Sequence, residues 1–185
     1  MCGRFCVSDK VAETVSKLFN IYFSVKPNSD LRPTEVVSTI IASNGNFQQL
    51  DVSWGIQPQW SKKLLINAQS ETVAIKPTFK NAFQYHRCLV PCSGWYEWRT
   101  ENGKKQKNLF SHKDSDSLFM GGIYFPSEQP QLVTLTTKPN NKCSDYHKRM
   151  PVIILPEDKD YWFNSSVEQL MPLLSPIDEK LISVQ

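Results

Sequence analysis

The residues with the greatest chemical potential stand at the start of the chain, in Met1-Cys2-Gly3-Arg4-Phe5. Removal of Met1 would give Cys2 a free α-amine and a thiol on adjacent carbons. The ordinary pKa values, about 8 for the amine and about 8.5 for the thiol, leave a nucleophilic fraction of each near neutral pH. Such a 1,2-aminothiol condenses with an aldehyde to an imine and then closes a five-membered thiazolidine ring. Alternatively, the amine serves as the base for the thiol, as in N-terminal nucleophile hydrolases.

Three further segments contain polar residues suited to catalysis. Asn67 lies in Ile66-Asn67-Ala68-Gln69-Ser70-Glu71-Thr72. Its competing interpretation is structural, as a side chain that caps a turn or forms a hydrogen bond with the local backbone. Glu97 lies between Tyr96 and Trp98, and aromatic neighbours that exclude water should raise the pKa of its carboxyl group, as a general acid requires. His147 precedes a basic residue and a proline at a loop-to-strand junction, a common place for functional residues. A surface position for Glu97 and a structural role for His147 are the competing interpretations.

The cysteine spacing also has to be compared with that of a zinc site. Cys2-x3-Cys6 and Cys88-x3-Cys92 resemble paired zinc ligands. Both pairs are predicted in extended chain, where four residues span roughly 13 Å. A tetrahedral zinc site with Zn–S bonds of ~2.3 Å holds its sulfurs under ~4 Å apart. We therefore expect no metal and no cofactor.

The bulk composition is that of an ordinary globular protein. The chain has 185 residues, of which 40% are hydrophobic and 21% charged, so a single domain over residues 1–185 is expected. No apolar run approaches the ~20 residues of a membrane span, and no secretory signal is visible. Five unevenly spaced cysteines favour a reducing compartment. We expect a cytoplasmic protein without a membrane partner, whose net charge of +3 tolerates a polyanion.

The hydrophobic pattern predicts many short strands and few helices. Val11 to Phe23 has helical spacing, and Asn44-Gly45 and Asn102-Gly103 are hairpin signals. Pro91 should interrupt the chain between two strands. The other expected strands are 36–42, 50–54, 87–90, 94–98, 107–111, 118–124, 131–137 and 150–155, with short helices at 157–163 and 167–174. This pattern predicts an α+β fold with a curved, largely antiparallel sheet or barrel core and a few short flanking helices.

Taken together, the segments resemble the SOS-response-associated peptidase (SRAP) family, whose members sense abasic sites in single-stranded DNA. The resemblance runs from Cys2 to about Leu155, nearly the whole chain. It rests on CGRF, the Pro33 region, Trp54-Gly55 with Trp60, INAQSET, KPTFKNAF, RCLVPCSGWYEW, the GKKQ turn, LTTKPN and HKRMPVIIL.

The resemblance implies a role for each of the four candidate catalytic residues. Cys2 is similar to the family's crosslinking nucleophile, exposed by loss of Met1. Asn67 is similar to the asparagine that orients the Cys2 amine and the opened sugar. Glu97 is similar to the acid/base that moves protons during imine and thiazolidine formation. His147 is similar to the histidine that assists opening of the deoxyribose ring, work suited to a pKa near 6.5.

The resemblance also implies contacts with DNA. Arg4 and Arg149 match positions that meet phosphates, and Pro33, Trp60 and Trp98 match apolar positions that support or stack on bases. Arginine forks and aromatic platforms are typical of single-strand binders.

Two positions do not fit this pattern simply. In a regular strand Trp98 would face away from Glu97, so both reach one site only if the strand ends or bulges there. Gln69 stands where the family usually has an arginine, which removes a positive charge beside the site.

The sequence thus predicts a sensor that forms a thiazolidine crosslink between Cys2 and an abasic site in single-stranded DNA, during the DNA damage or SOS response. A monomer that associates with the nucleoid when bound to DNA is expected, with lyase-type chemistry and a cysteine peptidase activity that removes Met1. The alternatives are an N-terminal-cysteine peptidase or autoprotease, and a non-reactive single-stranded DNA-binding module. A class II glutamine amidotransferase also begins Met-Cys-Gly, but its oxyanion segments are not found in this sequence.

Overall fold

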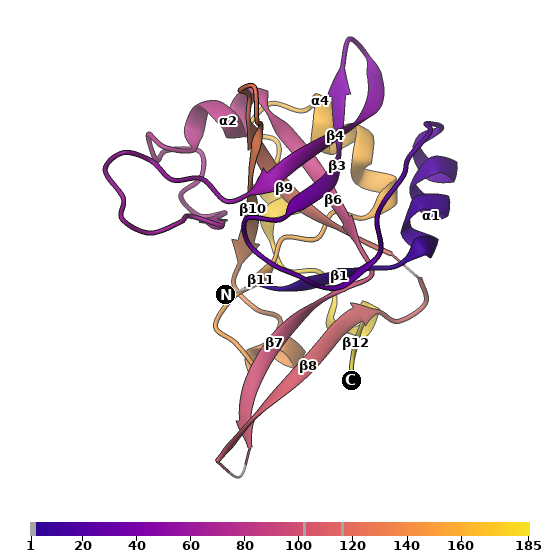
Figure 1. Ribbon diagram of the computed structural model, residues 1–185, viewed down its shortest axis with the longest axis vertical. Coiled ribbons are helices and arrows are strands. Elements are labelled where there is room, and N and C mark those ends of the chain that lie inside the picture. The colour runs from indigo at the N-terminus through magenta and orange to yellow at the C-terminus, as the bar shows by residue number, and fades with distance from the viewer. Residues whose placement is uncertain (1–2, 102, 116) are drawn as a thin grey trace.

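The strands of the protein form two sheets, seen in a computed structural model that describes residues 3–101, 103–115 and 117–185 (Figure 1). The first sheet has five strands. In spatial order these are β12 (Ile182–Val184), β8 (Lys104–His112), β7 (Gly94–Glu101), β1 (Phe5–Val7) and β2 (Asn28–Leu31).

The second sheet closes on itself to form a barrel. Its path is β11 (Met150–Pro151), β10 (Gln131–Thr137), β4 (Asn46–Trp54), β3 (Val36–Ser43), β6 (Arg87–Cys92) and β9 (Leu118–Phe125). Because β9 also pairs with β10, the ring of strands has no open edge between them. The short strand β5 (Asn67–Gln69) runs parallel to β10, as does β4, and the other pairings are antiparallel. The expected α+β fold with a largely antiparallel, curved core is confirmed.

The helices are short and lie outside the sheets. They are α1 (Asp9–Phe19), α2 (Lys80–Tyr85), α3 (Asn141–Ser144) and α4 (Lys159–Asn164), with 3₁₀ turns at Pro156–Asp158, Met171–Leu174 and Glu179–Leu181. In α1, Val11, Val15 and Phe19 recur at intervals of four residues and are buried, as its apolar spacing predicts. The helix ends four residues earlier than expected because Asn20 adopts a left-handed conformation with φ of 53°. No helix in the described ranges has the length and apolar character to cross a bilayer.

The hairpin turn predicted at Asn44-Gly45 is present, and of the second predicted turn Gly103 is described while Asn102 lies outside the described residues. Asn44 and Gly45 have φ angles of 51° and 77° between β3 and β4, the left-handed pair that a tight two-residue turn requires. Gly103, with φ of 75°, stands directly before β8. The resulting β7–β8 hairpin projects at the bottom of Figure 1, and α1 lies at the side of the barrel.

The expected break at Pro91 is wrong, since β6 continues through it to Cys92. Pro91 lies opposite Phe119 of β9, whereas on the other side the pairing of β6 with β3 is confined to Ile40 and Leu89. A residue without an N–H is tolerated where the strand has a free side. The expected strand at 150–155 is also shorter, because only Met150 and Pro151 form β11.

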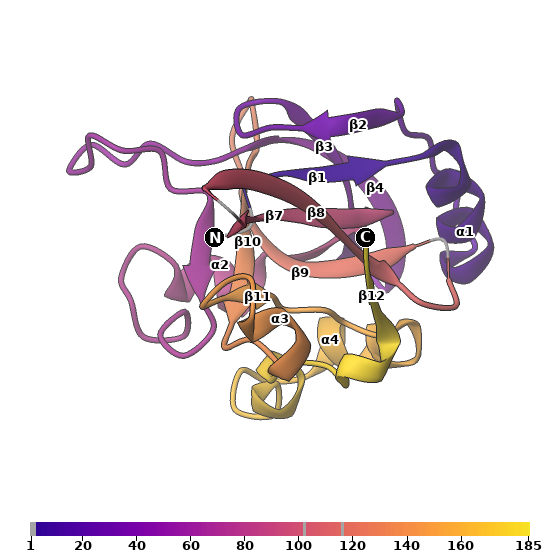
Figure 2. The same cartoon turned by 90° about the horizontal axis from the view of Figure 1, so that it is seen from below.

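The central position of β1 connects the sheet to the site. Phe5 pairs with Trp95 of β7 on one side and with Leu31 of β2 on the other. The view from below shows β1 running between β2 and the β7–β8 hairpin (Figure 2). Trp54, Trp95 and Trp162 are fully buried in the core, so the strands around β1 rest on large apolar side chains.

Candidate active site

Glu97 is the buried carboxyl group of this structure that best suits proton transfer. Its side chain belongs to β7 and the residue is only 4% exposed. Burial raises the pKa of Glu97 to about 7, because the charged carboxylate loses its hydration. The raised pKa agrees with the expectation, but Tyr96 and Trp98, the neighbours on which it rested, point to the opposite face of β7. A carboxyl group with this pKa is able both to give and to take a proton near neutral pH.

Glu97 and Trp98 lie on opposite faces of the hairpin. The pairing of β7 with β8 is unbroken from Trp95 opposite Phe110 to Glu101 opposite Lys104. Without a bulge, successive side chains point to opposite faces. Trp98 therefore shares a face with Tyr96 and Lys107, and the Lys107 ammonium lies 3.8 Å from the centre of the Tyr96 ring. The strand end or bulge that would bring both residues to one face is absent from this part of β7.

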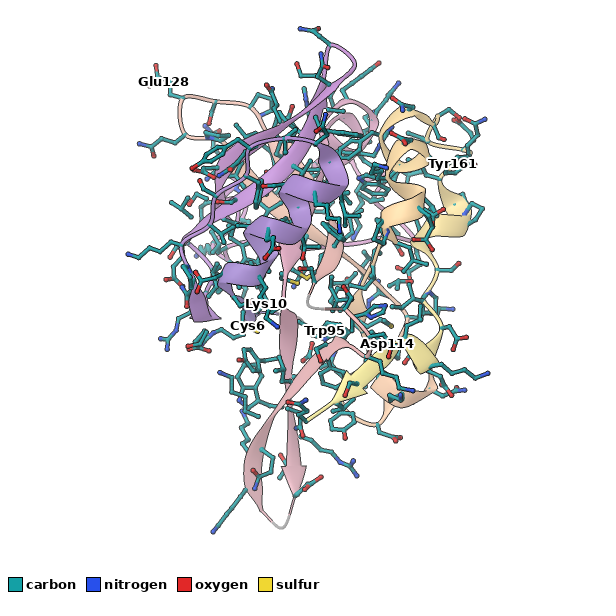
Figure 3. All side chains as sticks on the ribbon, turned by 90° about the vertical axis from the view of Figure 1, so that its right-hand side faces the viewer. Cys6, Lys10, Trp95, Asp114, Glu128 and Tyr161 are labelled. Atoms are coloured by element: carbon teal, nitrogen blue, oxygen red, sulfur yellow. The ribbon has the colours of Figure 1, made fainter. Side chains whose placement is uncertain are left out.

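The chain before β1 runs beside Glu97. The N–H of Tyr96 donates to the carbonyl of Arg4 at 2.9 Å, which continues the antiparallel pairing of β1 with β7 (Figure 3 labels Cys6 and Trp95 in these strands). Continuing that register sets Gly3, the first residue described, opposite Glu97. Cys2, the predicted nucleophile, and Met1 lie outside the described residues.

His147 follows α3, which packs near Glu97. The negative charge of Glu97 adds to burial in raising the pKa of the Cys143 thiol, and the N–H of His147 donates to the Cys143 carbonyl at 3.1 Å. The Nδ1 atom of His147 lies 3.0 Å from the backbone nitrogen of Arg149 and 3.2 Å from the carbonyl oxygen of the same residue. Burial lowers the pKa of His147 and the charge of Arg149 acts in the same direction, whereas the hydrogen bond to the Arg149 carbonyl raises it. The net lowering of the pKa favours the neutral imidazole near pH 7.

Asn67 lies on the barrel side of the site. It is the first residue of β5, which pairs in parallel with β10 and places Asn67 beside Thr134. The Thr134 hydroxyl donates to Oδ1 of Asn67 at 2.6 Å. This hydrogen bond fixes the plane of the amide, which is what a residue that orients a substrate requires.

Asn67 opens onto a hollow of about 390 Å³ that also contains two predicted DNA-binding residues. Trp60, which is 70% exposed, and Arg149 line it together with Gln69 of β5. The remaining lining residues are Leu65, Ala68, Lys76, Pro77, Thr78, Phe79 and Thr136. Glu97 and His147 do not line this hollow. Arg149 does line it and is bonded to the ring of His147, so it connects the hollow with the Glu97–His147 region.

Arg149 is engaged within the protein. Its guanidinium makes a two-pronged ion pair with Glu71, with N–O distances of 2.7 and 2.8 Å, and donates to the carbonyl of Thr136 at 2.5 Å. Its side chain is 16% exposed. The Arg149 guanidinium in turn lowers the pKa of the Glu71 carboxyl group. The sequence gives no sign of a role for Glu71, because its partner Arg149 lies 78 residues away in the chain.

Arg4, Pro33 and Trp98 form a third group on the outer face of the hairpin. Arg4 makes an ion pair of 2.8 Å with Asp30 of β2, and Lys107, which shares a face with Trp98, makes another of 2.7 Å. Pro33 is half-buried in the turn directly after β2. Nine site residues were predicted, and Cys2 lies outside the described residues. The other eight divide among the hollow, the Glu97–His147 region and this outer face.

The geometry offers acid–base groups and an amide but no metal centre. Within residues 3–101, 103–115 and 117–185, no group of three histidine, cysteine or acidic side chains is arranged to hold a metal. Four buried thiols lie in this part of the chain, at Cys6, Cys88, Cys92 and Cys143. Burial raises the pKa of the Cys6 and Cys143 thiols, which keeps them in the unreactive protonated form.

Comparison with known proteins places the chain among relatives of similar length. The Abasic site processing protein YoqW of Bacillus subtilis is 30% identical over 198 aligned residues, which cover 96% of this chain and 88% of YoqW. The Abasic site processing protein YedK of Escherichia coli is 28% identical over 182 residues, covering 90% and 81% of the two chains.

A crystal structure of a Bacteroides thetaiotaomicron protein superposes with a TM-score of 0.83 at 25% identity, covering 99% of this chain and 90% of that one. The family model described as "SOS response associated peptidase (SRAP)" matches residues 1–185. Its match includes Arg4 and the strands that carry Asn67 and Glu97. This chain therefore belongs to the SRAP family.

Proposed function

We propose that this protein processes abasic sites in single-stranded DNA through a covalent thiazolidine crosslink to Cys2, formed after Met1 is removed. The names of its relatives, which are abasic site processing proteins, support the choice of substrate. The observation that carries the proposal is Glu97, a buried carboxyl group with a pKa of about 7. The hydrogen bond between Tyr96 and Arg4 holds the chain just after Cys2 beside it.

The first step is opening of the abasic sugar, which we assign to His147. An abasic sugar is mostly a closed hemiacetal, and only its open form has the aldehyde that an amine attacks. The neutral imidazole takes the proton of the C1 hydroxyl group, and the imidazolium so formed gives a proton to the ring oxygen as the C–O bond breaks. His147 thereby ends in its initial state. A histidine whose pKa lies below its ordinary value is neutral near pH 7 and suits the first of these transfers.

The second step joins the opened sugar to Cys2. The amine attacks C1 to give a carbinolamine, whose hydroxyl group leaves as water with a proton from Glu97, which gives a protonated imine. The thiol sulfur then adds to the imine carbon and the thiol proton passes to the Glu97 carboxylate, while the nitrogen keeps its proton. One aldehyde and one aminothiol give one thiazolidine and one water, and Glu97 ends in its initial state. Asn67, with its amide plane fixed by Thr134, orients the amine and the sugar.

The DNA strand is proposed to contact the exposed Trp60 at the hollow and the cationic outer face of the hairpin. Trp60 offers a stacking surface that an unpaired base uses more readily than a paired one. Pro33 and Trp98 would support bases, and Arg4 and Arg149 would meet phosphates. We expect a monomer to suffice, because every proposed catalytic residue comes from the one chain. A DNA-associated role in the DNA damage or SOS response follows from this activity.

Self-removal of Met1 is a second candidate activity, supported by the word peptidase in the family description. It is measured as the intact mass of protein made by translation in vitro with methionine aminopeptidase inhibited. Loss of Met1 in the parent but not in Glu97→Gln supports it, and retention of Met1 in both contradicts it.

The crosslink is tested by incubation with a single-stranded oligonucleotide containing one abasic site, followed by a denaturing gel and intact mass. The expected adduct has the summed mass of protein and DNA less one water. Cys2→Ala should give no stable adduct, although its α-amine should still be trapped as an imine by borohydride. Cys6→Ser is the matched control, because Cys6 is a buried thiol of β1 that retains a hydrogen-bonding group when replaced by serine.

Three outcomes separate the possibilities. A stable adduct of Cys2→Ala without reductant contradicts the role of the thiol. An adduct with intact DNA, or with an abasic analogue that lacks the C1 hydroxyl group, contradicts the role of the aldehyde. Binding of abasic DNA by the parent without any adduct would favour the non-reactive binding module.

A further inference from the structure

Three cationic side chains converge on the carboxylate of Asp30 at the outer face of the hairpin. Arg4 donates to Oδ2 at 2.8 Å, and Arg32 donates to the same oxygen from Nε at 3.1 Å and from Nη2 at 2.7 Å. The Lys107 ammonium donates to Oδ1 at 2.7 Å. These residues come from four separate segments: the start of the chain, β2, the turn after β2, and β8. We call Arg4, Arg32 and Lys107 the cation cluster.

The cation cluster has more positive charge than its acidic partner neutralises. Three cations face the single charge of Asp30, and the first cause of the strongly lowered pKa of Asp30 is the bond from Lys107, followed by that from Arg32. The nearby carboxylate of Glu35 accepts the N–H of Arg32 and the amide of Asn28, both neutral donors, and adds one further negative charge to set against the three cations. A net positive charge therefore remains at this point of the surface.

The cation cluster is also open to solvent. The side chain of Arg32 is 61% exposed and that of Lys107 is 38% exposed. Ion pairs in such positions contribute little free energy because water competes for both partners. Lys107 gives only one of its three N–H donors to Asp30. Another anion can therefore reach the same donors at small cost.

The surroundings of the cation cluster suit a nucleic-acid backbone. Lys107 lies over the Tyr96 ring at 3.8 Å and 6.0 Å from the centre of the Trp98 ring. Aromatic rings beside cations are the surface on which single strands lie, with the bases on the rings and the phosphates on the cations. A phosphodiester has the same paired oxygens as a carboxylate and accepts the same charge-assisted hydrogen bonds.

We propose that the cation cluster is a phosphodiester-binding site for the nucleotide chain flanking the lesion, and that Asp30 occupies it as an internal anion until DNA phosphate takes its place. The site lies on the face of β7 opposite Glu97, so its phosphate belongs to a nucleotide beside the abasic one. This inference rests on the proposed action on single-stranded DNA. It predicts that Asp30 weakens the binding of DNA by the cations that it orders.

The test is Asp30→Asn, measured as equilibrium binding of an intact single-stranded oligonucleotide over a range of salt concentrations. Asparagine keeps an oxygen acceptor and the size of the side chain but removes the charge. Glu128→Gln is the charge-matched control, since Glu128 lies on the loop at the opposite end of the molecule from the hairpin (Figure 3). We expect Asp30→Asn to bind about three- to tenfold more tightly at low salt, because phosphate no longer has to displace an internal anion. Glu128→Gln should stay within about twofold of the parent.

Arg32→Gln gives a second measurement that does not depend on the folding of Asp30→Asn. Because its side chain is largely exposed, the variant should fold, and its salt slope should fall by ~0.7 relative to the parent. Binding by Asp30→Asn equal to or weaker than that of Glu128→Gln would overturn the proposal, as would an unchanged slope in Arg32→Gln. Intact DNA forms no crosslink, so this result is separate from the crosslinking test of the proposed function.

Discussion

Replacement of Glu97 by glutamine should stabilise the protein in a manner that depends on pH. The pKa of Glu97 is raised from the ordinary 4.5 to about 7 by burial. The pKa of Glu97 is higher in the folded than in the unfolded protein, so its contribution to the free energy of unfolding is fully present below pH 4.5. This contribution is lost as the pH rises toward and through 7, where the buried carboxyl group has to ionise. Glutamine has no proton to lose and avoids this cost.

The magnitude follows from the distance between the two pKa values. At 1.36 kcal/mol for each pH unit, the interval from 4.5 to 7 corresponds to about 3 kcal/mol at pH 8. For a domain of this size, that free energy of unfolding corresponds to a Tm difference of about 6–12 °C. The difference between Glu97→Gln and the parent should therefore grow by this amount between pH 4.5 and pH 8.

The assay is thermal and urea unfolding of both proteins at several pH values. Glu101→Gln is the matched control, because Glu101 is an exposed carboxylate of the same strand that pairs with Arg99. Its difference from the parent should vary little with pH. A Tm difference for Glu97→Gln that is the same at pH 4.5 and pH 8 would refute the reasoning. The same variant should crosslink abasic DNA ~10²–10⁴-fold more slowly, the usual contribution of a general acid or base.

Three further predictions concern the neighbouring groups. Glu71→Gln removes the charge that holds Arg149, so the pH dependence of crosslinking assigned to His147 should move, and a uniformly reduced rate with an unchanged pH profile would instead indicate a purely structural role. His147→Ala should slow adduct formation on natural closed-ring abasic sites far more than on a substrate with a free aldehyde, and equal slowing on both would count against a role in ring opening. Gln69→Arg should tighten non-covalent single-strand binding and steepen its salt dependence by ~0.7, and an unchanged salt slope would show that this side chain does not reach phosphate.

Elements with a strong local pattern were predictable from the sequence. The strand at 131–137 was expected with the bounds it has, and Asn44-Gly45 was expected as the hairpin turn between the strands that flank it. Alternation of apolar residues and left-handed turn residues are both properties of neighbouring positions. The break expected at Pro91 does not occur. A proline is tolerated where a strand has no neighbour on one side, and the arrangement of the whole sheet decides where that is.

The candidate site was predictable only in part, for the same reason. The raised pKa of Glu97 was expected, but not for the right reason, because its neighbours Tyr96 and Trp98 point to the opposite face of β7 and burial within the fold raises it. The roles of Glu71 and Asp30 could not be read, because Arg149 lies 78 residues from Glu71 and Lys107 lies 77 residues from Asp30. The sequence predicted that Trp98 and Glu97 face apart unless the strand ends or bulges between them. The register of β7 is unbroken there, so the two side chains do face apart.

The position of β1 gives a physical reason why the two faces of the hairpin would act together on the proposed DNA substrate. Its backbone pairs with β7, which holds Glu97, and with β2, which holds Asp30. Arg4 directly precedes this strand, with its carbonyl bonded to β7 and its guanidinium bonded to Asp30. A phosphate that replaced Asp30 at Arg4 would therefore hold the DNA at the segment that leads directly from Cys2. Proton transfer then remains on the buried face, where a raised pKa is possible, and the polyanion remains on the solvated face, where its charge costs little.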